Sequence, residues 1–304
     1  MRKLMPKAGI MVSMLLVLMA FDQPVSRITQ IDNPLPANNR EALAEICSIN
    51  NVAFRPGEEM TYKLYYNWNF VWLSAGEVTF RVTDKGSQYL LSAHGRTYKS
   101  YEWFYKVRDK YDTYVDKSTL LPAVSIRDVS EGNYRLYDKI TFDRNRNKAV
   151  SLRGKSKDTA TPTEYDIDFC MHDILSVIYS TRNLDFNKMK AGSTLPVKIF
   201  IDKETWPLQV KYLGKDPDKK IKGMGRFRAI QFSPQVVEGF YFKKGTEMKV
   251  WASDDKNKIP LMIESPLSVG SVKAVLKDYK GLKYDLTAMI KYDKNTKDGD
   301  LPDD

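Results

Sequence analysis

The sequence predicts a mainly β protein, an antiparallel β-barrel or a curved half-barrel or sandwich, with one packed α-helix. Short segments of alternating apolar and polar residues recur along the chain. Such alternation is typical of strands that bury one face. Turn residues separate the segments at intervals of roughly 8–12 residues, as in antiparallel sandwiches and barrels. Only one segment has clear helical spacing. Together these observations indicate a sheet covered by a single helix.

The prediction is organised around the stretch Gly57–Thr83. Apolar and polar residues alternate over Met60–Tyr66 and again over Val78–Val82, which indicates two strands. The connection between them is rich in aromatic residues. An aromatic connection of this kind either plugs the end of a β structure or forms the lip of a binding cavity.

Further strand patterns follow in both halves of the chain. We expect strands over Tyr89–Gly95, Arg108–Val115, Pro122–Val129, Tyr134–Asp143, Lys148–Leu152, Thr194–Ile201, Thr205–Leu213, Met224–Phe232, Thr246–Ala252, Ile259–Glu264 and Gly270–Tyr279. The helix is expected over His172–Asn183, with an apolar face and Asp173 as its N-cap. We expect this helix to pack across the open mouth or the concave face of the sheet.

The first twenty residues have the pattern of an export signal. Basic residues open the chain, an apolar run covers Gly9–Met19, and Ala20 is a small residue suited to cleavage before Phe21. An uncleaved membrane anchor is the alternative. We expect a signal peptide over 1–20, a linker with a short helix over 21–50, one β-rich domain over 51–284 and a charged tail over 285–304. No cysteine directly follows the apolar run, so we expect a periplasmic or cell-envelope protein without a lipoprotein anchor.

The chain contains two cysteines, Cys47 and Cys170. In an exported protein such a pair is a candidate disulfide. The bond would close a long loop, which is worth on the order of 4–5 kcal/mol in the chain-entropy model. Two buried free thiols are the alternative, because sequence does not show proximity.

Composition limits the class of partner. Of the 304 residues, 42% are hydrophobic, which is enough for a core, and the formal net charge is +10. Solvated lysines on exposed strand faces explain such a charge without any functional role. The functional alternative is attraction to an anionic surface, such as lipid headgroups or acidic glycans. No nucleic-acid-binding motif occurs, so we do not expect a nucleic-acid partner. We also expect no cofactor.

Three groups of short motifs follow one another in a recognisable order. They are Phe54–Tyr62 with Ala75–Glu77, Asp173–Tyr179 with Arg182 and Gly192–Leu195, and Ile259–Pro260 with Val269–Val272. In order and spacing they resemble the domain of unknown function 3108 family of exported bacterial proteins, over roughly Asn51–Leu282. The resemblance implies an exported protein with a strand-rich, barrel-like fold. It implies no particular chemistry, because the biochemical role of that family is not established.

Two aromatic sets are the best candidates for ligand binding. They are Trp68, Phe70 and Trp72, and then Tyr101, Trp103, Phe104 and Tyr105, with the basic residues Lys106 and Arg108 beside the second set. As the lip of a cavity, these rings would contact an acyl chain or a sugar. The basic side chains would hold a headgroup phosphate or an acidic sugar. Aromatic residues that cap the end of the core are the alternative.

Patterns for catalysis or metal binding are weak. No G-x-S-x-G motif occurs, so no catalytic residue is predicted. Strand alternation would place Asp166, Asp168, Cys170 and His172 on one face, just before Asp173. The same spacing is expected of an exposed strand that runs into a helix cap, and no metal site is predicted.

We therefore expect an exported, non-enzymatic protein that binds a hydrophobic or amphipathic, lipid-type component of the cell envelope, with peripheral contact to the membrane. One alternative is a glycan-binding surface protein that stacks sugars on Trp68 and Trp72. The other is an enzyme of envelope metabolism that uses the cluster between residues 166 and 173. An apolar cavity would favour the first function, a groove with exposed rings the second, and a deep pocket with converging carboxylates the third.

Overall fold

The computed structural model describes residues 47, 49–68, 71–103, 105–235, 247–267 and 270–292. In these described segments, fifteen strands form one antiparallel sheet. They are β1 (Glu59–Trp68), β2 (Val71–Lys85), β3 (Gln88–Thr97), β4 (Val107–Asp116), β5 (Pro122–Glu131), β6 (Tyr134–Asp143), β7 (Lys148–Gly154), β8 (Thr161–Asp166), β9 (Thr194–Ile201), β10 (Glu204–Ile221), β11 (Gly225–Pro234), β12 (Lys249–Ser253), β13 (Pro260–Pro266), β14 (Ser271–Lys280) and β15 (Met289–Tyr292). The helix is α3 (Ile174–Thr181), and short 3₁₀ turns cover η2 (Lys157–Thr159) and η3 (Phe186–Lys188).

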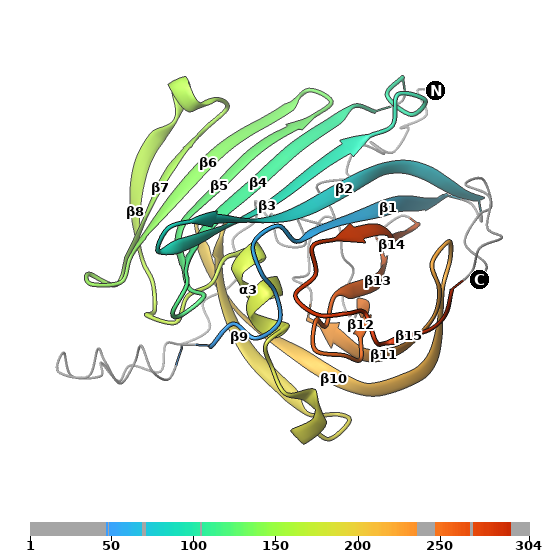
Figure 1. Cartoon of the computed structure of the whole chain (residues 1–304). Coiled ribbons are helices and arrows are strands. Elements are labelled where there is room, and N and C mark those ends of the chain that lie inside the picture. The colour runs from blue at the N-terminus through green and yellow to red at the C-terminus, as the bar shows by residue number, and fades with distance from the viewer. Residues whose placement is uncertain are drawn as a thin grey trace.

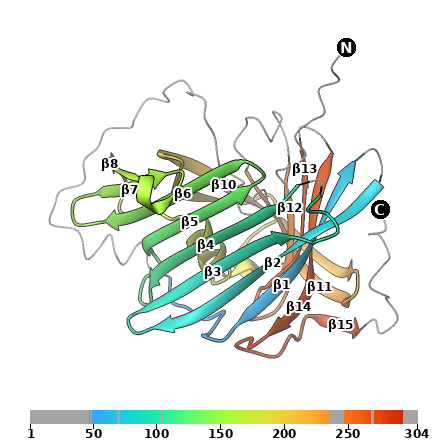
Figure 2. The ribbon, with the colours of Figure 1, turned by 90° about the horizontal axis from the view of Figure 1, so that it is seen from above.

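The sheet is curved and open (Figures 1 and 2). Its order is β8-β7-β6-β5-β4-β3-β2-β1-β14-β13-β12-β11-β10-β9, with β15 beside β11. In the described part of the chain no pairing joins β8 to β9, so the two edges do not close into a barrel. The prediction of an antiparallel half-barrel with one packed helix is confirmed.

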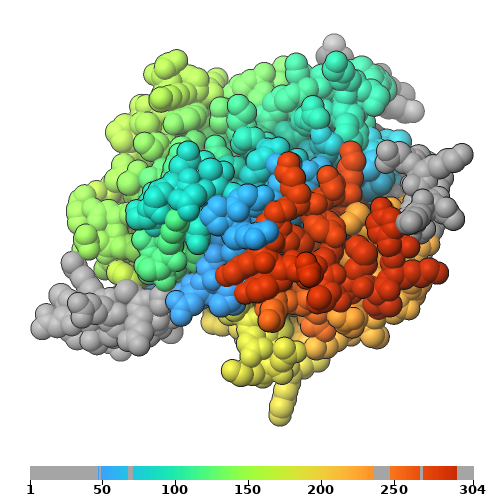
Figure 3. Space-filling view, in the orientation of Figure 1, coloured from blue at the N-terminus to red at the C-terminus, as the bar shows by residue number. Residues whose placement is uncertain are grey.

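β1 joins the two halves of the sheet. It pairs with β2 on one side and with β14 on the other. The segment before β1 lies against the segment after β14 on the surface (Figure 3). There Arg55 Nε donates to the Gly281 carbonyl at 3.1 Å, and Lys283 Nζ donates to the Asn51 carbonyl at 3.1 Å. The hairpin of β1 and β2 therefore joins the early strands (β2–β8) to the late strands (β9–β14) within one sheet.

The helix α3 lies in the hollow of the sheet (Figure 1) and contacts β3, β4 and β9. Asp173 is its N-cap, as predicted, and accepts a hydrogen bond from the Ser176 amide at 2.9 Å. The same carboxylate accepts hydrogen bonds from Thr113 on β4 and from Ser125 on β5, the latter at 2.8 Å. The cap therefore also attaches the helix to the sheet. No helix among the described residues is long and apolar enough to cross a membrane.

Two strands were not expected from the sequence. The edge strand β8 exposes nearly all its side chains, so it lacks the alternating buried face that marks a strand. The strand β15 pairs with β11, and the sheet therefore extends past residue 284, where the domain was expected to end. The expected helix before Cys47 and the expected signal peptide lie outside the described residues.

Candidate functional site

An apolar cavity lies between α3 and the strands of the C-terminal half. The space open to the centre of a water molecule is about 140 Å³. Each neighbouring element contributes apolar side chains, among them Ile178 of α3, Val197 of β9, Val210 of β10, Ile230 of β11, Val250 of β12 and Ile263 of β13. Tyr62 of β1 closes one side, and its hydroxyl donates to the Pro260 carbonyl at 2.8 Å. The Tyr62 hydroxyl therefore has its hydrogen-bond partner in the protein, and its ring presents an apolar surface to the cavity.

Polar groups line the cavity at the C-terminal end of α3. Arg182 is 4% exposed, and its guanidinium donates to both carboxylate oxygens of Glu58, at 2.6 and 2.8 Å. Its Nε donates to the Asn257 carbonyl at 3.0 Å. Every nitrogen of this guanidinium therefore has an acceptor in the protein, and the charge is neutralised by Glu58.

Lys258 is the other cation on the cavity wall. Its ammonium group makes no ion pair or hydrogen bond within the described part of the chain. Burial lowers the pKa of Lys258, and the Arg182 charge acts in the same direction, while Asp185 and Asp255 partly oppose them. A half-buried ammonium without a close counterion is a favourable place for the anionic end of a ligand.

Of the first aromatic set, the described side chain of Trp72 does not line this cavity. Trp72 is 7% exposed and belongs to the main core, and Lys273 Nζ lies 4.2 Å from the centre of its ring. The side chains of Trp68 and Phe70 lie outside the described residues. In the backbone, Trp68 is the last residue of β1 and Trp72 is the second residue of β2, so these two belong to the strands.

The second aromatic set is divided between core and surface. Tyr101 is 9% exposed, and burial raises its pKa to about 12. Trp103 is 84% exposed, and Lys106 is exposed as well. Arg108, near the start of β4, pairs with Glu102 of the preceding connection. None of these residues lines the apolar cavity, and their part in ligand binding stays a prediction.

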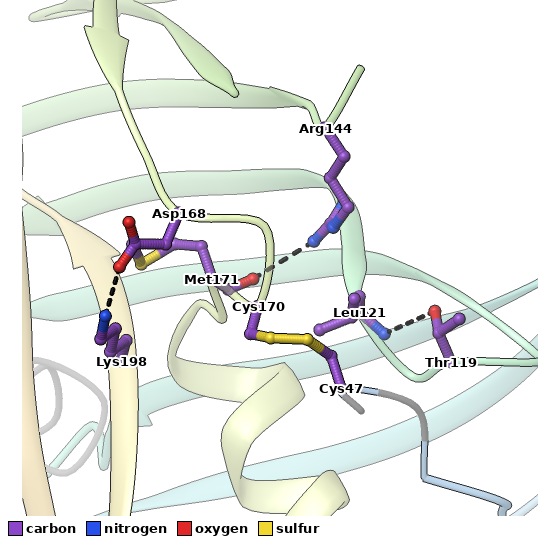
Figure 4. Close-up of a disulfide and its surroundings, with 8 residues drawn as sticks. All are labelled: Cys47, Thr119, Leu121, Arg144, Asp168, Cys170, Met171 and Lys198. Carbon is purple, nitrogen blue, oxygen red and sulfur yellow. Dashed lines mark hydrogen bonds and ion pairs between the residues drawn. A yellow bond between two sulfur atoms is a disulfide. The ribbon is translucent and has the colours of Figure 1, made fainter. Parts of the chain in front are cut away.

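The two cysteines form a disulfide (Figure 4). Cys47 and Cys170 have Cα atoms 5.4 Å apart and are separated by 123 positions in the sequence. The bond attaches the start of the described chain to the segment that leads into α3. Disulfides persist mainly in oxidising compartments, so the bond indicates a location outside the cytoplasm.

The remaining members of the 166–173 cluster have separate partners. Asp166 pairs with Lys148 at 2.8 Å, and Asp168 pairs with Lys198 (Figure 4). His172 Nδ1 lies 3.0 Å from Ser176 Oγ, and burial lowers the pKa of this imidazole to about 4. The described residues contain no group of three His, Cys, Asp or Glu side chains placed to hold a metal ion.

A serine, a histidine and an aspartate do meet on β3 and β4. Ser92 Oγ donates to Asp112 Oδ1 at 2.5 Å, and His94 Nε2 lies 3.6 Å from the same oxygen. The carboxylate therefore lies between the serine and the histidine. A nucleophilic serine needs the base at its own hydroxyl, with the carboxylate behind that base. This arrangement does not provide an activated serine.

The comparisons assign the family. The profile of the family described as "Protein of unknown function (DUF3108)" matches residues 61–277. The chain belongs to this family. The resemblance seen in the short motifs is therefore confirmed. No curated protein matches the chain.

Two solved structures resemble the fold at low sequence identity. A β-barrel-like protein of domain of unknown function 1849 from Brucella abortus is 12% identical, with a TM-score of 0.51 over 77% of this chain and 100% of that chain. This likeness concerns the fold alone. A protein from Bacteroides fragilis, described as exported with a YmcC-like fold, is also 12% identical over 77% of this chain and 100% of that one, but its TM-score of 0.30 supports no argument.

Proposed function

We propose that this member of the family is exported to the periplasm or cell envelope and binds the hydrophobic chain of an amphipathic, anionic envelope component beside α3. The observation that carries the proposal is the apolar cavity with Lys258 at its wall. Lipid-type molecules with a carboxylate or a similar anionic end have the matching chemistry.

An apolar cavity of roughly 150 Å³ lined by side chains such as Leu, Ile and Phe stays dry and takes apolar ligands, and each buried methylene gains about 0.8 kcal/mol. The anionic end would then neutralise Lys258, whose ammonium has no close counterion. Because Glu58 already neutralises Arg182, Lys258 is the group that selects for charge.

The test compares a long-chain fatty acid with the alcohol of equal chain length, bound to the purified, disulfide-bonded protein. We expect Lys258→Gln to lower the affinity for the acid about tenfold, which corresponds to the loss of one charge-assisted hydrogen bond. The affinity for the alcohol should stay unchanged. The matched control is Lys256→Gln, an exposed lysine of the same turn that does not line the cavity. Ile178→Trp should lower the affinity for both ligands, because the larger side chain fills the cavity.

Equal affinity of Ile178→Trp and the wild type for both ligands, with the fold retained by circular dichroism, would place the ligand elsewhere. Mass spectrometry of the native protein gives an independent check, since a copurified lipid is expected.

The two alternatives have less support. A glycan platform needs an exposed ring face, whereas Trp72 is 7% exposed with Lys273 over its ring. An enzyme built on the 166–173 cluster needs converging side chains, whereas Asp166, Asp168 and His172 are held by different partners.

A further inference from the structure

A second pocket lies on the opposite face of the same sheet. Its volume is about 560 Å³. On β13, Ile263 lines the apolar cavity, whereas its neighbours Met262 and Glu264 line the second pocket. Because successive side chains of a strand point to opposite faces, the sheet itself separates the two sites.

The lining of this pocket is strongly basic. Among the described residues, its charged side chains are Lys219, Lys220, Lys222 and Lys273, and one carboxylate, that of Glu264. Three of the lysines come from the far end of the β10–β11 hairpin, and Lys273 comes from β14. The hairpin therefore brings three positive charges to the face on which β14 already carries a fourth.

Two of these lysines are packed into the protein instead of extending into solvent. The Lys273 side chain is 8% exposed, with its Nζ 3.7 Å from Glu264 and 4.2 Å from the centre of the Trp72 ring. Lys219 Nζ lies 3.8 Å from the centre of the Trp251 ring. Aromatic faces attract ammonium groups and hold them in position, but they do not neutralise the charge.

The charges in the pocket also act on one another. Burial lowers the pKa of Lys219, and the charges of Lys273 and Lys249 act in the same direction, against Asp216 and Glu264. An anion placed between these ammonium groups would remove part of this repulsion.

We propose that the pocket binds a phosphate group, carried either by a soluble phosphate ester or by a lipid headgroup. Lysine ammonium groups are compact point charges, and several of them can bind the oxygens of one phosphate from different sides. Arginine, whose planar fork matches a carboxylate, is absent from the described lining. Asn67 and Ser271 add neutral donors, and the volume leaves room for the group to which the phosphate is attached. This site is independent of the proposed cavity ligand.

The experiment uses the purified, disulfide-bonded protein and two kinds of probe. One is soluble glycerol 3-phosphate in titration calorimetry, and the other is vesicle sedimentation with phosphatidylglycerol against phosphatidylcholine. The pocket variant is Lys219→Gln with Lys220→Gln and Lys222→Gln. The control variant removes three exposed lysines that do not line the pocket, Lys155→Gln, Lys157→Gln and Lys203→Gln, and so changes the net charge equally.

We expect at least a tenfold loss of phosphate binding in the pocket variant and no loss in the control. Binding of glycerol 3-phosphate assigns a soluble ester. Binding of phosphatidylglycerol vesicles alone assigns a lipid headgroup. The proposal is overturned if neither probe binds, if both variants lose binding equally, or if polygalacturonate, which carries carboxylates and no phosphate, binds more tightly than the phosphate probes. Ile178→Trp should leave phosphate binding unchanged, so failure at this pocket and failure at the apolar cavity are distinguishable.

Discussion

The strongest prediction concerns Asp109, a buried carboxyl on β4. Asp109 is 1% exposed, and one of its carboxylate oxygens accepts a hydrogen bond from the Ser130 amide at 3.0 Å. Burial raises the pKa of Asp109 to about 7, while hydrogen bonds from Ser130 and with the buried Glu131 partly offset that effect, and the Asp128 charge adds to it. Two neighbouring carboxyls in a place that excludes water favour a state in which one of them keeps its proton.

The sign of the effect follows from proton binding. Because the folded-state pKa lies above the ordinary value of 3.8, the folded protein holds a proton that the unfolded chain releases between pH 4 and 7. The proton on Asp109 therefore contributes its full amount to the free energy of unfolding below about pH 4, and this contribution is lost as the pH rises through 7. A shift of roughly three units at 1.36 kcal/mol each sets an upper limit of about 4 kcal/mol.

Asp109→Asn imitates the protonated carboxyl, so its free energy of unfolding should not contain this pH-dependent loss. We expect the variant to match the wild type near pH 4 and to be more stable at pH 8, by up to about 4 kcal/mol. Urea unfolding followed by circular dichroism at pH 4, 6 and 8 measures the difference.

Asp138→Asn provides the matched control, because this equally buried aspartate accepts hydrogen bonds from Arg127 at 2.7 Å, Arg153 at 2.9 Å and Ser151 at 2.8 Å. Loss of that charge should destabilise the protein at pH 8 by roughly 3–5 kcal/mol, opposite in sign to Asp109→Asn. A difference between Asp109→Asn and the wild type that does not change with pH would refute the reasoning.

Three further predictions concern the contacts around α3, and urea unfolding at pH 7 measures each of them. Glu58→Gln leaves the buried Arg182 without its counterion and should cost roughly 3–5 kcal/mol. Cys47→Ser with Cys170→Ser opens a loop with a sequence separation of 123 and should cost about 5 kcal/mol in the chain-entropy model, whereas an unchanged unfolding energy would exclude the bond as a stabilising element. Asp173→Ala removes both the cap of α3 and its hydrogen bonds to the sheet, so it should cost more than the roughly 1 kcal/mol of an ordinary cap.

Local patterns were sufficient for most of the architecture. The alternation that predicted the strands arises because one face of each strand is buried, and the spacing around Asp173 predicted the helix start because a cap acts within one turn. The same rules missed β8, whose side chains are nearly all exposed and therefore carry no alternation. They also missed β15, which pairs with β11 through its backbone although its side chains are largely exposed.

The candidate sites were less accessible to sequence reasoning. The clustered aromatics predicted a ligand site, whereas Trp72 belongs to the core and also lines the basic pocket. The apolar cavity takes its wall from α3 and from strands far apart in the chain, so no local motif marks it. No sequence motif marks Lys258. Only the structure places it on the cavity wall, beside Arg182 at the C-terminal end of α3.

The sequence by itself determined the kind of fold, the family and the capped helix α3, because each of these depends on periodicity and on contacts between neighbours in the chain. Tertiary structure alone decided which faces of the sheet are hollow and which charges they contain. Those properties depend on pairing β14 with β1 and on the course of the β10–β11 hairpin, which bring together residues that the chain keeps far apart. The opening hairpin is central for this reason: it pairs with β14 through β1 and contributes Tyr62 to the apolar cavity and Trp72 to the basic pocket.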